Sequence, residues 1–301
     1  MDLPDVKSVA TTAELFSRAV AGSVLPDAIW GGGDTLPMES ELHTGVRISA
    51  DLLQHYRDVC EFADDGQVPV TFPSILGFAA GLRLMTARRF PLRALGMIHL
   101  TDRITAERAL HADDVLSVRV HVENLRAHRL GALVDVVTEV RTADDASRVA
   151  WQEVSTYLSR GARVAGADAA AHPVTDAVEV DVPDSDPAST STVVSLSGGL
   201  GRAFAGVSGD RNPIHMHPLL ARAFGFRTTI IHGRWMMARS VAAVADSLTP
   251  AVSVVSAFRK PLFIPGDARL LTLTTAQEAQ VWLTGVDGTP MHAFTHTNNR
   301  T

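Results

Sequence analysis

The sequence contains one cysteine, Cys60, among its 301 residues. A single cysteine excludes an intramolecular disulfide, so nothing in the chain calls for an oxidising compartment, and we expect a cytoplasmic protein. Cys60 lies in an amphipathic helical pattern, which favours a small core residue over a reactive thiol.

Long apolar runs and an excess of basic residues are also lacking. The longest apolar-rich stretch, residues 236–248, is interrupted by Arg239, Ser240, Asp246 and Ser247, so it cannot cross a bilayer. The N-terminus has no apolar core of the kind found in signal peptides. Lys and Arg number 27 against 33 Asp and Glu, and no basic stripe alternates with aromatic residues, so we expect neither a membrane nor a nucleic-acid partner. With 46% hydrophobic and 20% charged residues, the composition is that of a globular protein.

Residues 161–189 are rich in Ala, Asp and Pro and show little hydrophobic periodicity. We interpret this segment as a linker between an N-terminal half, residues 1–160, and a C-terminal half, residues 190–301.

The two halves repeat one order of elements, a long apolar helix followed by antiparallel strands. In the first half, helical patterns cover 49–63 and 74–88, and period-2 patterns predict strands within 116–124, 132–142 and 148–160. In the second half a long apolar helix is expected over 230–248, and a hairpin turn at 286–289. We therefore predict an α+β protein of two antiparallel sheets, each wrapped around a long central helix and joined edge to edge, which removes two exposed strand edges.

Residues 206–217, GVSGDRNPIHMH, concentrate groups that could do chemistry. The stretch departs from the G-x-S-x-G nucleophile elbow, because Asp210 replaces the last glycine. GGLGRAF, just upstream, departs from a dinucleotide loop, because Phe204 replaces the last glycine and no parallel βαβ unit surrounds it. A metal site from Asp210, His215, His217 and His232 would have no recognised zinc spacing.

The remaining interpretations are an acid–base pair and an ordinary polar turn. Pro213 prevents a continuous helix and favours an extended Asn212, so a tight turn could bring Asp210 and His215 to one site around a water molecule. A local turn in which Asp210 is only a cap stays open. Gly233 opens the next apolar helix with a bare N–H that could stabilise a developing oxyanion.

The segments AFAGVSGDRNPIHMHPLLARAFGF and IIHGRWMM resemble the hydratase motif of MaoC-like (R)-specific enoyl-thioester hydratases, which are hot-dog-fold proteins. FRKPLFIPGD resembles the next landmark of that family, and the match covers about 190–301. As a whole the chain resembles the actinobacterial double-hot-dog (R)-3-hydroxyacyl-thioester dehydratases. Met is commoner than Arg234 after His-Gly in the family pattern, and an Asp or Asn is usual at the place of His217.

This resemblance implies a function and roles for five residues. Asp210 and His215 match the catalytic pair, Asn212 a residue that orients the aspartate, Ser208 a supporting hydrogen-bond partner, and Gly233 the donor to the thioester oxygen. The implied reaction is reversible hydration of trans-2-enoyl thioesters of CoA or acyl carrier protein, with no metal or other cofactor. A thioesterase and a non-catalytic acyl-thioester-binding subunit are the alternatives.

The N-terminal half lacks the motif. It has Asp64 and Asp65, but no N-P-I-H, and Phe72-Pro73 stands near the place of His-Gly. We expect this degenerate hot-dog to be non-catalytic and to accommodate the acyl chain, with the helix at 75–85 either bordering an acyl tunnel or simply packing in the core. The sequence also leaves room for a homodimer.

Overall fold

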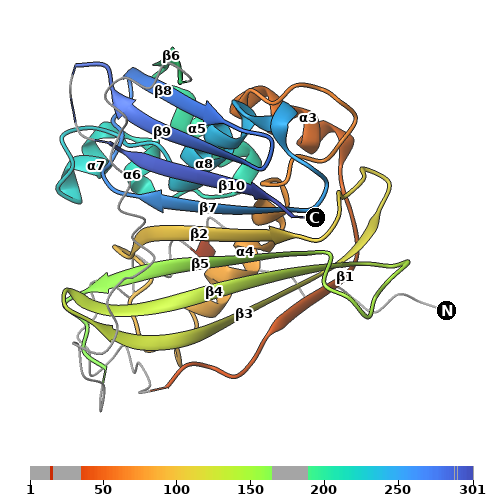
Figure 1. The fold of residues 1–301 in the computed structure, drawn as a ribbon. Helices are drawn as coiled ribbons and strands as arrows, with labels where there is room; N and C mark the ends of the chain where they lie inside the picture. The colour runs from red at the N-terminus through yellow and green to blue at the C-terminus, as the bar shows by residue number, and fades with distance from the viewer. Residues whose placement is uncertain (1–13, 16–34, 165–188, 288, 290, 301) are drawn as a thin grey trace.

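The structure is a computed structural model that describes residues 14–15, 35–164, 189–287, 289 and 291–300. Within these residues the strands form one antiparallel sheet, in the order β1-β3-β4-β5-β2-β7-β10-β9-β8-β6 (Figure 1). Most of the expected linker at 161–189 lies outside the described residues.

Over residues 35–164 the elements are β1 (Glu41–Arg47), α3 (Ala50–Cys60), α4 (Pro73–Met85), β2 (Ile98–Ala106), β3 (Val115–His128), β4 (Gly131–Thr142) and β5 (Trp151–Arg160). The elements after the expected linker are β6 (Thr190–Leu196), α5 (Leu200–Ser208), α6 (Pro213–Met216), α7 (Pro218–Ala223), α8 (Gly233–Ala242), the 3₁₀ turn η1 (Ala245–Ser247), β7 (Val252–Phe258), β8 (Gly266–Thr274), β9 (Glu278–Gly285) and β10 (Ala293–Asn299). The predicted period-2 segments are strands, and β9 pairs antiparallel with β10. Residue 288 of the turn predicted at 286–289 lies outside the described residues.

The predicted edge-to-edge junction is confirmed, and it makes one continuous sheet of the two halves rather than two distinct sheets. β2 pairs with β7, from Thr101 opposite Ala257 to Ala106 opposite Val252. The order of the strands on one side of this junction mirrors the order on the other, so β1 to β5 correspond to β6 to β10. The repeat in the sequence is therefore a repeat in the fold. Pairing β2 with β7 satisfies two edges that separate sheets would leave open.

Helices α4 and α8 lie on the same side of the sheet (Figure 1), α4 against β3 and β4 and α8 against β9 and β10. A Cβ at Gly77 would lie 2.7 Å from Thr138, and one at Gly81 would lie 3.2 Å from Val136. The small residues of α4 thus bring its backbone close to the sheet, which favours core packing over an acyl tunnel along this face.

The predicted helix over 230–248 is shorter than expected. It begins at Gly233 and ends at Ala242, and η1 follows. Ser247 Oγ donates to the carbonyl of Val244 at 2.7 Å, so a local side-chain bond competes with continuation of the helix. No helix among the described residues is long and apolar enough to cross a membrane.

Candidate active site

The loop between α5 and α6 carries the predicted site residues, and its shape follows from three residues. Gly209 ends α5 with φ at 73°, a left-handed conformation that glycine adopts without strain. Asn212 is extended, with φ −53° and ψ 128°, as the following proline requires. Pro213 then starts the one-turn helix α6. The chain turns sharply enough to bring Asp210 and His215 together.

Asp210 is held by its neighbours in the loop. The backbone N–H of Asn212 donates to Asp210 Oδ1 at 3.1 Å, and the backbone N–H of Asp210 donates to Ser208 Oγ at 3.2 Å. The Ser208 hydroxyl in turn donates to the Phe204 carbonyl at 2.8 Å. Asn212 therefore contacts the aspartate through its backbone, whereas its side chain caps α6 by accepting from Ile214 N–H. These bonds fix the carboxylate relative to the end of α5.

His215 lies buried on α6 with a defined tautomer. Its Nδ1 is 2.8 Å from the carbonyl of Ile230. Because a carbonyl only accepts, Nδ1 carries the proton, and a neutral ring leaves Nε2 as an acceptor. Burial lowers the pKa of His215, and the nearby Asp210 partly offsets this. A Cβ at Gly201 would clash with the His215 carbonyl oxygen, so only glycine lets α5 approach this closely.

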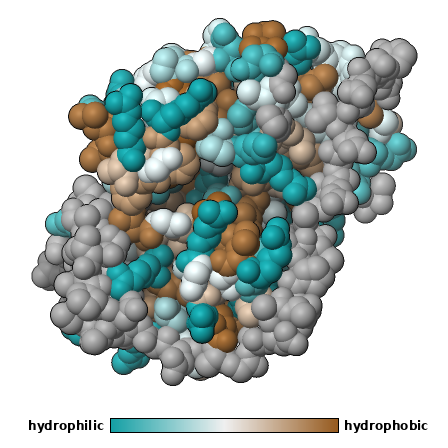
Figure 2. Space-filling model, turned by 90° about the vertical axis from the view of Figure 1, so that its left-hand side faces the viewer, coloured by the Kyte–Doolittle hydropathy of each residue, from teal (hydrophilic) through white to brown (hydrophobic). Residues whose placement is uncertain are grey.

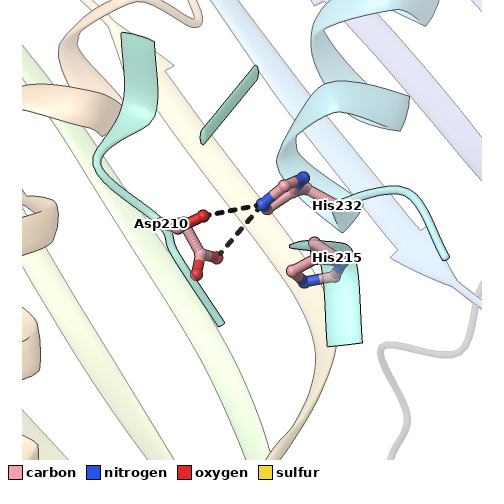
Figure 3. A group of neighbouring side chains, drawn as sticks. All are labelled: Asp210, His215 and His232. Carbon is pink, nitrogen blue, oxygen red and sulfur yellow. Dashed lines mark hydrogen bonds and ion pairs between the residues drawn. The ribbon is translucent and has the colours of Figure 1, made fainter. Parts of the chain in front are cut away.

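His232, which the sequence indicated only as a candidate metal ligand, lies in one cluster with Asp210 and His215. Its ring stacks on that of His215, with centroids 3.7 Å apart, and its Nε2–H donates to the carbonyl of Asp210 at 2.9 Å (Figure 3). Burial lowers the pKa of His232 to about 3, so the ring is neutral at physiological pH. His232 thus holds the backbone of Asp210 from the side opposite Ser208.

The same three side chains are also candidate metal ligands. Ligand atoms of Asp210, His215 and His232 all lie within 4.8 Å of one another, whereas His217 instead caps α7 by accepting from Leu219 N–H. The two stacked rings have planes only 27° apart, and each already donates one N–H to a carbonyl. Ring lone pairs lie in the ring plane, so stacked rings do not direct them at one tetrahedral ion. The geometry favours proton transfer over metal binding.

Gly233 is the first residue of α8, directly after His232. The N–H of a first helical residue has no acceptor within its helix, and the helix dipole makes this end attractive to negative charge. In the N-terminal half the corresponding first residue, of α4, is Pro73, which has no N–H. Asp64 there pairs with Arg57, and Asp65 accepts from Gln67 N–H, so both serve a local turn. Among the described residues, the acid–base cluster and a helix start with an N–H occur together in the C-terminal half alone.

The N-terminal half nevertheless contributes a wall to the site. The His99 ring stacks on Tyr157 at 4.5 Å and lies 4.8 Å from the ring of Phe258, which in turn borders Gly233. Burial raises the pKa of Tyr157, Arg234 partly offsets this, and the carboxylates of Asp102 and Glu153 add to the rise. Figure 2 views the molecule from the side on which β5 and β7 end, and shows a hollow in this face beside hydrophilic and hydrophobic residues.

Comparisons with known proteins identify the family of the chain. The MaoC like domain matches residues 187–280. The chain is 34% identical over 255 residues, 84% of its length, to 3-hydroxyacyl-thioester dehydratase X of Mycobacterium tuberculosis, of which it covers 85%. The crystal structure of HtdX from that organism superimposes with a TM-score of 0.72 at 29% identity, covering 87% of this chain and 100% of that one. A conserved hypothetical protein of M. tuberculosis with a double hot-dog fold is 12% identical with a TM-score of 0.55, covering 91% of this chain and 99% of that one, and shares the fold alone. The chain belongs to the MaoC-like dehydratase family.

Proposed function

We propose that this protein reversibly adds water to trans-2-enoyl thioesters to give (R)-3-hydroxyacyl thioesters, with Asp210 and His215 as the catalytic pair. The observation that carries the proposal is the neutral His215, whose Nε2 is left as an acceptor beside the Asp210 carboxylate and near the helix start at Gly233. The 3-hydroxyacyl-thioester dehydratase named above supports the same substrate class.

The reaction follows from these groups. The thioester oxygen accepts the N–H of Gly233, which makes C3 of the enoyl group more electrophilic and stabilises the enolate. A water molecule lies between Asp210 and His215, and the pair accepts its proton as the oxygen bonds to C3. The pair then returns a proton to C2, so one water is added in full. In the dehydration direction the same groups act in reverse, and no metal or redox cofactor takes part.

The two halves divide the work in this proposal. Residues 190–301 hold the chemistry, residues 1–160 form a non-catalytic half that accommodates the acyl chain, and 161–189 links them. Pro73 in place of Gly233 supports the first assignment. The role of residues 1–160 in accommodating the acyl chain is supported by a cavity of about 110 Å³ at the end of α8 opposite Gly233. Residues of both halves line this cavity, including Trp151, Val241 and Val252. CoA or acyl carrier protein carries the acyl group.

The test is loss of enoyl-thioester absorbance with crotonyl-CoA and its longer homologues. Asp210→Asn and His215→Ala should each lower kcat by about 10²–10⁴-fold, and the double variant should be scarcely worse because both groups serve one water. His217→Ala is the matched control, a nearby histidine that only caps α7. Release of free thiol instead of hydration would indicate a thioesterase, and near-full hydration activity in either single variant would refute the mechanism.

A further inference from the structure

Arg234 follows Gly233 in the first turn of α8, and its side chain reaches across to the N-terminal half. Its Nη2 donates to Glu153 Oε2 at 3.1 Å and to Ser155 Oγ at 3.0 Å, both on β5. Only 12% of the Arg234 side chain and 1% of the Glu153 side chain are exposed. The residue next to the proposed oxyanion donor is therefore held by a buried ion pair between the halves.

Hydrogen bonds extend this ion pair into two further elements of the N-terminal half. The hydroxyl of Ser74, on α4, donates to Glu153 Oε1 at 2.6 Å. The hydroxyl of Ser155 donates to Asp102 Oδ1 at 2.5 Å, and His99 Nε2 lies 2.9 Å from the same oxygen. The network thus runs from the first turn of α8 through β5 to α4 and β2, and ends at the His99 ring in the wall of the site.

Stability alone does not account for these charges. Removing a carboxylate and a guanidinium from water costs free energy, and apolar residues of similar volume often stabilise a protein as well or better. Burial raises the pKa of Glu153, and Arg234 partly offsets this. Unlike an apolar contact, a hydrogen-bonded ion pair is directional and holds its two side chains at a fixed distance. It can therefore fix the position of one backbone relative to another.

We propose that Arg234 is a positioning residue for hydration, which holds the Gly233 N–H in place by tying the first turn of α8 to Glu153. This inference rests on the proposed function, since it assigns Arg234 a role through Gly233. Trp235 Nε1 donates to the Val59 carbonyl at 2.9 Å and anchors the same turn to α3. The Phe258 ring borders Gly233 on the other side, 3.2 Å from where a Cβ would be. Gly233 is thereby constrained from three directions, and Arg234 supplies the one that involves β5.

The test compares two arginines of the same helix. Arg239 also lies on α8 with 11% of its side chain exposed, and its Nη2 is 2.8 Å from Glu61 Oε2, but it is six residues beyond Gly233. Arg234→Met should lower kcat for crotonyl-CoA by about 10- to 100-fold with little change in KM, because a misplacement of about 1 Å can cost about 10²-fold. Arg239→Met should lower the midpoint of thermal unfolding and leave kcat per folded protein unchanged.

Further variants keep the proposal testable if Arg234→Met does not fold. Glu153→Gln keeps the shape of the side chain but removes its charge and one of its two acceptor oxygens, and it should lower kcat less than Arg234→Met does. Arg234→Lys should restore part of the activity, and Arg234→Met with Glu153→Gln should be no worse than Arg234→Met alone, since both act through one link. Wild-type kcat in folded Arg234→Met, or in Glu153→Gln, would overturn the proposal. Full activity in Asp210→Asn would instead overturn the proposed function, so the two failures are distinct.

Discussion

Replacing Asp210 with asparagine should lower the pKa of His215. Burial already lowers this pKa below its ordinary value of 6.5, and the negative charge of Asp210 partly offsets the burial. Asparagine keeps the size and the loop hydrogen bonds but removes the charge. The imidazolium form then loses its partner, so a proton should bind His215 less tightly in the variant than in the wild type.

The expected size of this change follows from the distance between the groups. The side-chain atoms lie within 4.8 Å of one another. At that separation two opposite unit charges attract by about 0.9 kcal/mol in a water-like medium and about 3.5 kcal/mol at an effective dielectric constant of about 20. Loss of an attraction of this size destabilises the imidazolium form, so the pKa of His215 should fall. The Asp210 side chain is 24% exposed, so the attraction should lie between these limits.

Histidine ring signals in NMR spectra of labelled protein measure this directly, with His215→Ala identifying the resonance. His128 serves as an internal control, because burial and two arginines, rather than Asp210, lower its pKa. In activity, the wild-type kcat/KM should fall only as the pH drops below 6.5, since His215 must be neutral to accept a proton. An unchanged His215 titration in Asp210→Asn would show that the two groups are not electrostatically coupled. The proposal that one water molecule lies between them would then be refuted.

Three other variants test the remaining assignments. Gly233→Ala places a Cβ 3.2 Å from the Phe258 ring, so the start of α8 should shift slightly. We expect kcat to fall by up to about 10²-fold while the midpoint of thermal unfolding changes little. A lowered midpoint with unchanged kcat would make Gly233 a packing residue. The pKa of His232 in the folded protein is about 3, so the free energy of unfolding of the wild type should fall by up to about 1.4 kcal/mol for each pH unit below 6.5. His232→Phe should reduce this dependence on pH. If urea unfolding at several pH values gives the same dependence for variant and wild type, this prediction is contradicted. The isolated segment 190–301 exposes the edge of β7 that β2 covers in the whole protein, so light scattering should detect self-association through this edge. A monodisperse monomer would contradict this expectation.

The repeat and the loop of the candidate site could be predicted from sequence because their causes are local. Alternation along residues 132–142 predicts β4, and Pro213 with Gly209 determines how the chain turns between α5 and α6. The joining of the two halves edge to edge was predicted, but the strands that form the junction were not, since the pairing of β2 with β7 depends on how two distant edges meet. The end of the helix at Ala242 was not predicted either, because no proline or glycine marks it.

The contacts that join distant residues escaped prediction for a similar reason. His215 and His232 stack across the turn before α8, and Arg234 pairs with Glu153, which is 81 residues earlier in the chain. Nothing near Glu153 indicates a partner, since charge within a strand usually faces solvent. The one available signal was Arg234 itself, an arginine directly after the helix-opening glycine, where a buried cation needs a counter-ion.

The proline at the start of α4 has a consequence for how this protein can change over time. Two identical halves would carry two reaction centres, and every substitution would alter both at once. In the proposed division of work, Pro73 leaves α4 without the N–H that Gly233 presents, so the N-terminal half is released from the demands of the chemical step. Its surface can then diversify toward acyl groups of different length or polarity, while Asp210 and His215 stay as they are. An asymmetric molecule of this kind separates the evolution of substrate choice from that of the chemical step.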